Sequence, residues 1–177
     1  IRGSGFDEVW FVVNRDGTRY IERMVQRQAS LAPADQFFVD CGTTSSTGQI
    51  STFPGISRFN GRTVAILADG HVLTQQAISG STATLGATYS TVQLGLPYTS
   101  DIETLNVDVS LQDGTSQGRK IKISQLVIRF LNSRGGEIGP DTSTLYDIQH
   151  PTESTGITVF STDIKETMDG GYCDGGR

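Results

Sequence analysis

Two strand-like segments joined by Asp69-Gly70 constrain the fold of this chain more than any other feature. Residues 62–68 are rich in apolar and β-branched side chains, and a similar segment resumes at His71. An Asp-Gly pair supplies the positive backbone φ angles that a two-residue hairpin turn requires. We therefore predict a β-hairpin here, within a chain built from short strands and tight turns.

A second hairpin is predicted near the start of the chain. Residues 8–13 and 18–23 flank the turn-forming segment Asn14-Arg15-Asp16-Gly17, and the first of these strands is aromatic and β-branched. We expect Trp10 to lie in the core. Apolar residues at spacings of three to four within residues 20–34 allow a short helix after the hairpin.

Further strand-like segments follow at short, regular intervals with turn residues between them. Hydrophobic residues make up 36% of the chain and charged residues 19%, and its 21 glycines suit a turn-rich β protein better than a helical one. We predict an all-β domain of β-sandwich or barrel-like type. The expected strands are residues 63–67, 71–78, 81–85, 91–94, 104–111, 120–132 and 156–160.

The apolar alternation changes phase within residues 120–132. Ile121 and Ile123 share one parity, whereas Leu126, Ile128 and Phe130 share the other. One continuous strand would therefore turn its apolar side over between residues 124 and 125. Either a β-bulge at this point or a chain that passes from one sheet to another would explain the change.

Several segments resemble the tail tubular protein B family, which forms the nozzle of short-tailed bacteriophages. They are "DEVWFVVNRDGTRYIERM", "GRTVAILADGHV", "GLPYTSDIETL" and "IRFLNSRGGEIGPD", and they follow one another in order along the chain. The resemblance implies a structural virion protein without a catalytic role, assembled in the host cytoplasm and resident in the virion tail. It also implies a homo-oligomer, a hexameric ring by analogy, which contacts adaptor and fibre proteins and conducts genome DNA without binding it specifically.

The resemblance and the composition together predict three parts. Residues 1–42 would be a β-hairpin and connector adjoining a larger, propeller-like β body, of which the hairpin is a remnant. Residues 43–60 are rich in Ser, Thr and Gly and would be a linker loop. Residues 61–177 would be the β-sandwich or barrel domain with a flexible C-terminal tail. Because the sequence begins at Ile1, we expect it to be a fragment of a longer polypeptide.

The charge balance argues against a protein that grips nucleic acid. The formal net charge is −5 at pH 7, whereas binding to phosphates requires clustered Lys and Arg. The densest basic group, Arg119-Lys120-Lys122, alternates with isoleucines and is typical of the solvated face of a strand. An acidic surface would suit a conduit along which DNA slides, because like charges repel.

Neither the cysteines nor the histidines form a recognisable site. Cys41 and Cys173 belong to no Cys-x-x-Cys or Cys/His cluster, which argues against a zinc site, and thiols of a protein assembled in the cytoplasm are expected to stay free. His71 and His150 have no Gly-x-Ser-x-Gly elbow beside them and are interpreted as surface residues. No apolar run reaches the length that spans a bilayer.

The acidic residues form no recognisable catalytic or metal-binding pattern. Asp101 and Glu103 have the same-face spacing of a strand, roughly 6–7 Å, which does not by itself provide the opposed pair of a glycosidase. The acidic C-terminal residues lack the ligand order of a calcium loop; they are Asp163, Glu166, Asp169 and Asp174. We predict no enzyme and no catalytic, cofactor-binding or metal-binding residues.

A different class of function stays open. A carbohydrate-binding β-sandwich that recognises the host surface needs aromatic side chains on a groove or loop. The available tyrosines are Tyr89, Tyr98, Tyr146 and Tyr172. An envelope hydrolase is a third hypothesis, but the sequence lacks the acidic or serine constellation that it would require.

Overall fold

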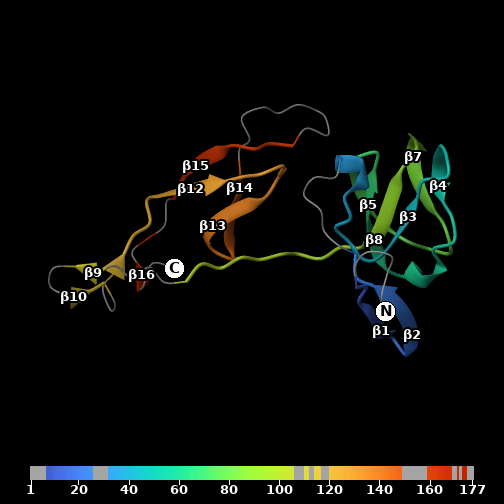
Figure 1. Cartoon of the computed structure of the whole chain (residues 1–177), viewed down its shortest axis with the longest axis horizontal. Coiled ribbons are helices and arrows are strands. Elements are labelled where there is room, and N and C mark those ends of the chain that lie inside the picture. The colour runs from blue at the N-terminus through green and yellow to red at the C-terminus, as the bar shows by residue number, and fades with distance from the viewer. Residues whose placement is uncertain are drawn as a thin grey trace. The chain divides into compact units, whose positions relative to one another are not determined.

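The computed structural model shows an all-β protein. It describes residues 7–25, 32–105, 110–111, 114–116, 120–148, 159–168, 171 and 173–174. All strand pairs among these residues are antiparallel, and the helical segments are two short 3-10 turns, η1 (Pro33–Asp35) and η2 (Ser57–Phe59). The all-β fold class predicted from the sequence is therefore confirmed (Figure 1).

The chain divides into two compact units, Ile1–Thr99 and Ser100–Arg177. This division differs from the one expected, which placed the boundary at residues 43–60. Among the described residues, unit 1 contains the N-terminal hairpin and two further sheets, and unit 2 contains four two-stranded sheets. Each unit is described by itself below.

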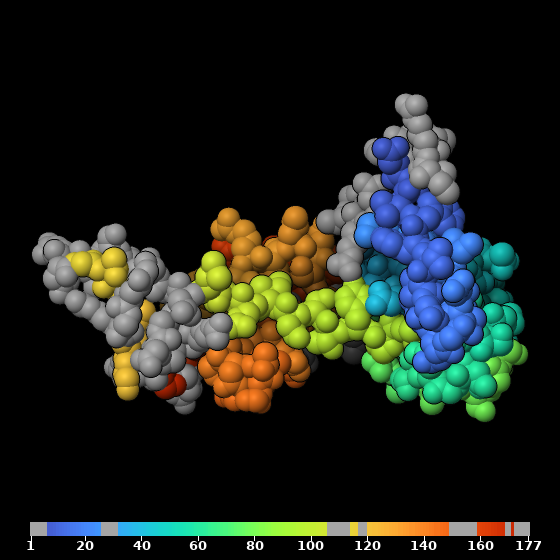
Figure 2. Space-filling view, turned by 90° about the horizontal axis from the view of Figure 1, so that it is seen from below, coloured from blue at the N-terminus to red at the C-terminus, as the bar shows by residue number. Residues whose placement is uncertain are grey.

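The predicted N-terminal hairpin is present, and it lies on the surface of unit 1 (Figure 2). Strands β1 (Trp10–Arg15) and β2 (Thr18–Arg23) pair along their whole length. Asp16 and Gly17 have φ angles of 51° and 84°, as a two-residue hairpin turn requires. Trp10 is 43% exposed, so the expectation that it lies in the core is wrong.

The main sheet of unit 1 has four strands in the order β3-β8-β5-β6. These strands are β3 (Asp40–Ser45), β8 (Val92–Leu96), β5 (Thr63–Ala68) and β6 (His71–Ala77). A second sheet pairs β4 (Ile50–Phe53) with β7 (Ala83–Tyr89). The predicted β5–β6 hairpin turns at Asp69 and Gly70, with φ angles of 47° and 82°.

The core of unit 1 lies between these two sheets. Alternate residues of β5 and β8 and residues of β4 and β7 contribute to one cluster, so the two sheets pack face to face as in a small sandwich. Phe59 of η2 and Ile56 just before it add two large, fully buried side chains to the cluster. Its buried members are Phe53, Ile56, Phe59, Val64, Ile66, Ala68, Ile78, Ala83, Leu85, Val92 and Leu94.

The expected linker at residues 43–60 is not a loop. It contributes the second half of β3, all of β4 and the η2 turn, and it buries Phe53, Ile56 and Phe59. The Ser and Thr residues of β3 are held by backbone pairing with β8, which does not require apolar side chains. The three buried residues are spaced three apart across an irregular turn, a pattern that period-two alternation does not detect.

Unit 2 consists of short antiparallel pairs. They are β9 (Ser110–Leu111) with β10 (Gly114–Thr115), β11 (Lys120–Ile121) with β16 (Cys173–Asp174), β12 (Gln125–Arg129) with β15 (Asp163–Thr167), and β13 (Glu137–Asp141) with β14 (Thr144–Asp147). The sequence predicts one long strand over residues 120–132. The structure divides it into β11 and β12, which pair with different strands, in agreement with the second of the two explanations for the change of phase.

Two other expected strands are present only in part. Leu105 is 91% exposed and is not part of a strand, residues 106–109 lie outside the described residues, and β9 begins at Ser110. Residues 156–158 of the expected strand 156–160 are also outside the described part. Phe160 forms an isolated antiparallel bridge with Ser133.

The exposed segment that follows the boundary between the units is expected to be a site of proteolytic cleavage. Asp101 to Leu105 are exposed and outside regular structure, so a protease can bind this backbone without opening a sheet. Limited digestion with a glutamate-specific protease is expected to accumulate a fragment that ends at Glu103. Mass spectrometry identifies it, and digestion of unit 1 without this intermediate would contradict the division.

Candidate functional site

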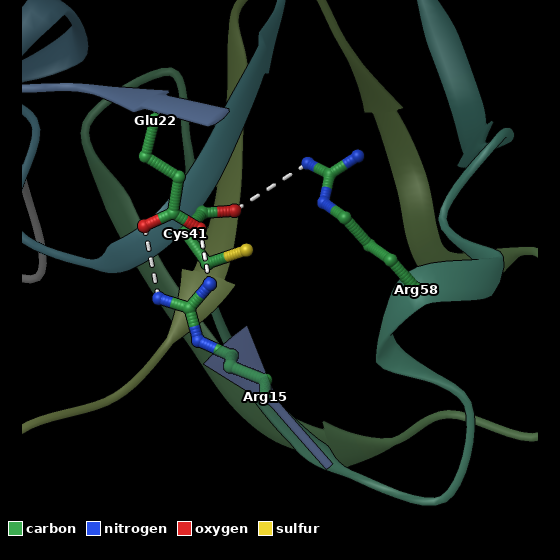
Figure 3. A network of polar contacts seen from close by, with 4 residues as sticks. All are labelled: Arg15, Glu22, Cys41 and Arg58. Carbon is green, nitrogen blue, oxygen red and sulfur yellow. Dashed lines mark hydrogen bonds and ion pairs between the residues drawn. The ribbon is translucent and has the colours of Figure 1, made fainter. Parts of the chain in front are cut away.

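A polar cluster joins the N-terminal hairpin to the main sheet of unit 1. It consists of Arg15 on β1, Glu22 on β2, Cys41 on β3 and Arg58 on η2 (Figure 3). Arg15 and Glu22 form a two-point ion pair, in which Arg15 Nη2 donates to Glu22 Oε2 at 2.9 Å and Nη1 donates to Oε1. Their side chains are 20% and 21% exposed, so the pair is largely shielded from solvent.

Cys41 reaches this cluster because β3 is bulged. The register with β8 shifts after Asp40, so that Cys41 and Gly42 together stand opposite Gly95. Cys41 has a φ of 53°, a left-handed conformation that is uncommon for a residue with a side chain. Its carbonyl accepts a long hydrogen bond of 3.4 Å from Nη2 of Arg58, whose guanidinium also lies 4.6 Å from the centre of the Phe59 ring.

The thiol of Cys41 is free, and its surroundings hold it in the neutral form. Burial raises the pKa of the thiol, and its hydrogen bond with Glu22 raises that pKa further. The hydrogen bonds from Arg15 lower the pKa of Glu22, so this carboxylate stays charged and accepts a hydrogen bond from the neutral Cys41 thiol. A nucleophilic cysteine needs a lowered pKa. The cluster is therefore suited to holding the hairpin in place rather than to covalent chemistry.

Asp69 makes a second polar connection within unit 1. Its carboxylate accepts hydrogen bonds from the backbone N–H groups of Thr91, at 2.7 Å, and Ser90, at 3.0 Å. The Asp69 N–H in turn donates to the Thr91 carbonyl at 2.8 Å. These bonds tie the β5–β6 turn to the β7–β8 turn, and they lower the pKa of Asp69. Sequence reasoning assigned Asp69 to the turn but missed this connection, which depends on a segment some twenty residues away.

The histidines considered in the sequence form no catalytic pair in the described part of the chain. His71 is exposed at the first residue of β6. His150 lies outside the described residues. Where residues are described, no group of three or more His, Cys, Asp or Glu side chains is placed to hold a metal ion.

The two carboxylates at Asp101 and Glu103 do not lie on a strand. Both residues are exposed, and the same-face spacing assumed for them does not apply. Asp163 instead forms a two-point ion pair with Arg129, at 2.7 and 2.8 Å. Glu166 stands opposite Leu126 in the β12–β15 pair.

Some of the acidic, basic and cysteine residues discussed from the sequence lie outside the described residues. Asp169 is not among the described residues, and neither the side chain of Asp174 nor that of Cys173 is described. Lys120 and Lys122 are exposed, and Arg119 lies outside the described residues.

The tyrosines differ in their surroundings. Tyr89 packs against the core of unit 1, whereas Tyr98 and Tyr146 are 38% and 56% exposed. Tyr172 lies outside the described residues.

Comparison with known proteins adds no assignment: no family model matches the chain, and a search of curated proteins finds no match. Within the described residues, there is also no helix whose length and hydropathy would let it cross a membrane.

Asn in place of Asp69 tests the connection between the two turns. Asn tolerates the left-handed backbone but has one oxygen rather than two, so Asp69→Asn is expected to lower the free energy of unfolding by about 1 kcal/mol in urea denaturation. The control is Asp16→Asn at the equivalent turn position of β1–β2. The Asp16 side chain is 83% exposed and pairs with Arg62, so the expected loss is below about 0.5 kcal/mol.

The effect of Asp69→Asn should depend on pH. The folded-state pKa of Asp69 is lowered relative to an unfolded value of about 3.9. Its contribution is therefore fully present above about pH 4 and is lost as the pH falls through the folded-state pKa. The difference between wild type and variant should shrink over that acidic range. Equal losses for the two Asn variants, or a difference independent of pH, would contradict the assignment.

The raised pKa of Cys41 predicts slow alkylation. Iodoacetamide should modify Cys41 more slowly at pH 7 than it modifies a cysteine in a short peptide, because the thiolate is the reacting species. Glu22→Gln removes the charge that favours the neutral thiol and should increase the rate, while burial keeps it below the peptide value. Peptide mapping separates Cys41 from Cys173. A rate above the peptide value in the wild type would refute this description.

Proposed function

We propose that this chain is a structural component of a short bacteriophage tail, part of the nozzle that retains and conducts DNA and joins other tail components. The resemblance to the tail tubular protein B family is the observation that supports this proposal most directly. Its segments cover residues 7–24, 61–72, 95–105 and 128–141. They extend over both units, so the resemblance is not limited to one hairpin.

The roles of these segments suit a scaffold. Residues 7–24 contain the β1–β2 hairpin, and residues 61–72 contain the β5–β6 turn that Asp69 joins to its neighbour. Residues 128–141 contain the end of β12, the connection that follows it and the whole of β13. The polar groups in these segments bind other groups of the same chain, as in a protein whose work is assembly rather than catalysis.

The arrangement of charge also supports a conduit. The chain carries a net charge of −5, and several of its arginines are neutralised by carboxylates. Arg15 pairs with Glu22, Arg62 with Asp16, and Arg129 with Asp163. An arginine that already has an anionic partner gains less from a DNA phosphate, so DNA would pass such a surface without being held.

Light scattering of the purified chain and of a longer parent polypeptide tests this function. A closed ring of the parent, visible by electron microscopy, with no retention of duplex DNA at physiological salt, is the expected result. A parent that stays monomeric would contradict the nozzle proposal, as would tight binding of DNA.

A carbohydrate-binding module is the second candidate, favoured by the exposed rings of Tyr98 and Tyr146. A glycan array distinguishes the two functions. Binding of a glycan that is lost in Tyr146→Ala, together with a monomeric parent, would replace the nozzle proposal with this one.

A further inference from the structure

One face of the β1–β2 hairpin is exposed to solvent and is called its outward face here. Cross-strand register places three pairs on it: Trp10 with Arg23, Val12 with Ile21, and Asn14 with Arg19. All six side chains are exposed.

The opposite face of the hairpin is turned toward the rest of unit 1. Its half-buried members are Val13, Arg15, Tyr20 and Glu22, and two of these belong to the polar cluster with Cys41. In the part of the chain that the structure describes, the hairpin is therefore held through this face, while the side chains of its outward face are exposed.

The centre of the outward face consists of apolar side chains that are exposed to solvent. Val12 is 71% exposed and Ile21 is 75% exposed, although they form a direct cross-strand pair, and Trp10 beside them is 43% exposed. An isolated two-stranded ribbon is marginally stable in water, and contiguous exposed apolar side chains mark an interaction surface. A partner that covers this pair would stabilise the ribbon.

The order of residues makes this face complementary to a copy of itself. When two such faces meet across a two-fold axis parallel to the strands, each residue lies over the cross-strand partner of its counterpart. Trp10 then lies over Arg23 of the second copy, in the geometry of a cation–π contact. Val12 covers Ile21 of the second copy.

At the turn end of the ribbon, the same axis places Asn14 over Arg19 of the second copy, where the amide oxygen can accept a guanidinium N–H. Each of these contacts occurs twice. A two-fold axis across the strands would instead stack Arg19 over Arg23 of the second copy and bring like charges together. Charge therefore favours the axis parallel to the strands.

Glu8 holds Trp10 and Arg23 in place at one end of the outward face. Its Oε2 accepts a hydrogen bond of 3.2 Å from Trp10 Nε1, and its Oε1 pairs with Arg23 Nη1 at 3.1 Å. The indole and the guanidinium are thus held beside each other before any partner arrives. Their positions cost less entropy to fix on binding.

We propose that the outward face of the β1–β2 hairpin binds a second copy of this chain in a two-fold dimer. Val12 and Ile21 form its centre, and Trp10 with Arg23 forms its two outer contacts. The contact is isologous and closes at two copies, so it is separate from the heterologous contacts that a ring requires. It does not rest on the proposed tail function.

Sedimentation velocity over a range of protein concentrations tests the dimer. The wild-type chain should change from monomer to dimer as the concentration rises. Ile21→Lys buries two ammonium groups in the apolar centre and should weaken association by at least about tenfold. The matched control is Val72→Lys, which changes an aliphatic side chain that is 82% exposed on β6 and should leave association unchanged.

Thermal melting establishes that each variant remains folded. A wild-type chain that stays monomeric at millimolar concentration overturns the proposal, and so does equal association of wild type and Ile21→Lys.

Arg19→Glu tests the direction of the axis. In the proposed dimer Arg19 lies over Asn14 of the second copy, so this substitution relieves no repulsion and should not tighten association. With the axis across the strands, it would replace two contacts between arginines by two ion pairs. Tighter association of Arg19→Glu than of the wild type would therefore overturn the proposed geometry.

Discussion

Unit 1 depends on the burial of one apolar face of β5 and β8 against the second sheet. These two strands are the inner strands of the main sheet, and each presents alternate side chains to the core. Val64 and Leu94 lose all contact with solvent, and each such side chain contributes about 1.5–3 kcal/mol through the hydrophobic effect. The other elements of unit 1 are arranged around this contact, because the turns and connectors must begin and end where the packed strands do.

The attachments around that core are mainly polar. The ion pair of Arg15 and Glu22 and the bulge at Cys41 bring the hairpin to the edge strand β3, whereas Asp69 fixes two turns at the end of the sheet. Directional contacts of this kind specify a geometry but add little net stability, because the same groups are well solvated in the unfolded chain. The hairpin is thus placed precisely while much of its own apolar surface stays exposed.

The hairpins could be predicted from the sequence because their information is local. Two Asp-Gly pairs determine the turns of β1–β2 and β5–β6, and alternation determines which residues of β5 are buried. The strands β3 and β4 could not be predicted in this way, since Ser and Thr residues enter a sheet through backbone pairing with distant strands. The core position of Phe59 has the same origin, because it depends on where η2 packs and not on any local period.

The candidate site was still less accessible from the sequence. Nothing local to Cys41 indicates a bulge, since its left-handed backbone results from the register between β3 and β8. The second role of Asp69 likewise requires the backbone of Ser90 and Thr91. The exposed position of Trp10 was missed because an aromatic residue in a strand usually indicates a core, whereas here it lies on the exposed face of the hairpin.

The bulge has one further consequence, which concerns Gly42 and Gly95. A methyl group on Gly95 would lie 2.7 Å from the Asp40 carbonyl oxygen and 2.6 Å from a methyl carbon of Val39, and one on Gly42 would lie 2.7 Å from the same side chain. Each of these glycines has only a hydrogen atom where other residues have a side chain. Residues 36–39, which lead into β3, can therefore lie close against the sheet at this point. Even the smallest side chain at either glycine position would force these residues away. Glycine is consequently required at positions 42 and 95. The small polar residues that follow Gly42 in β3 could be replaced by many others.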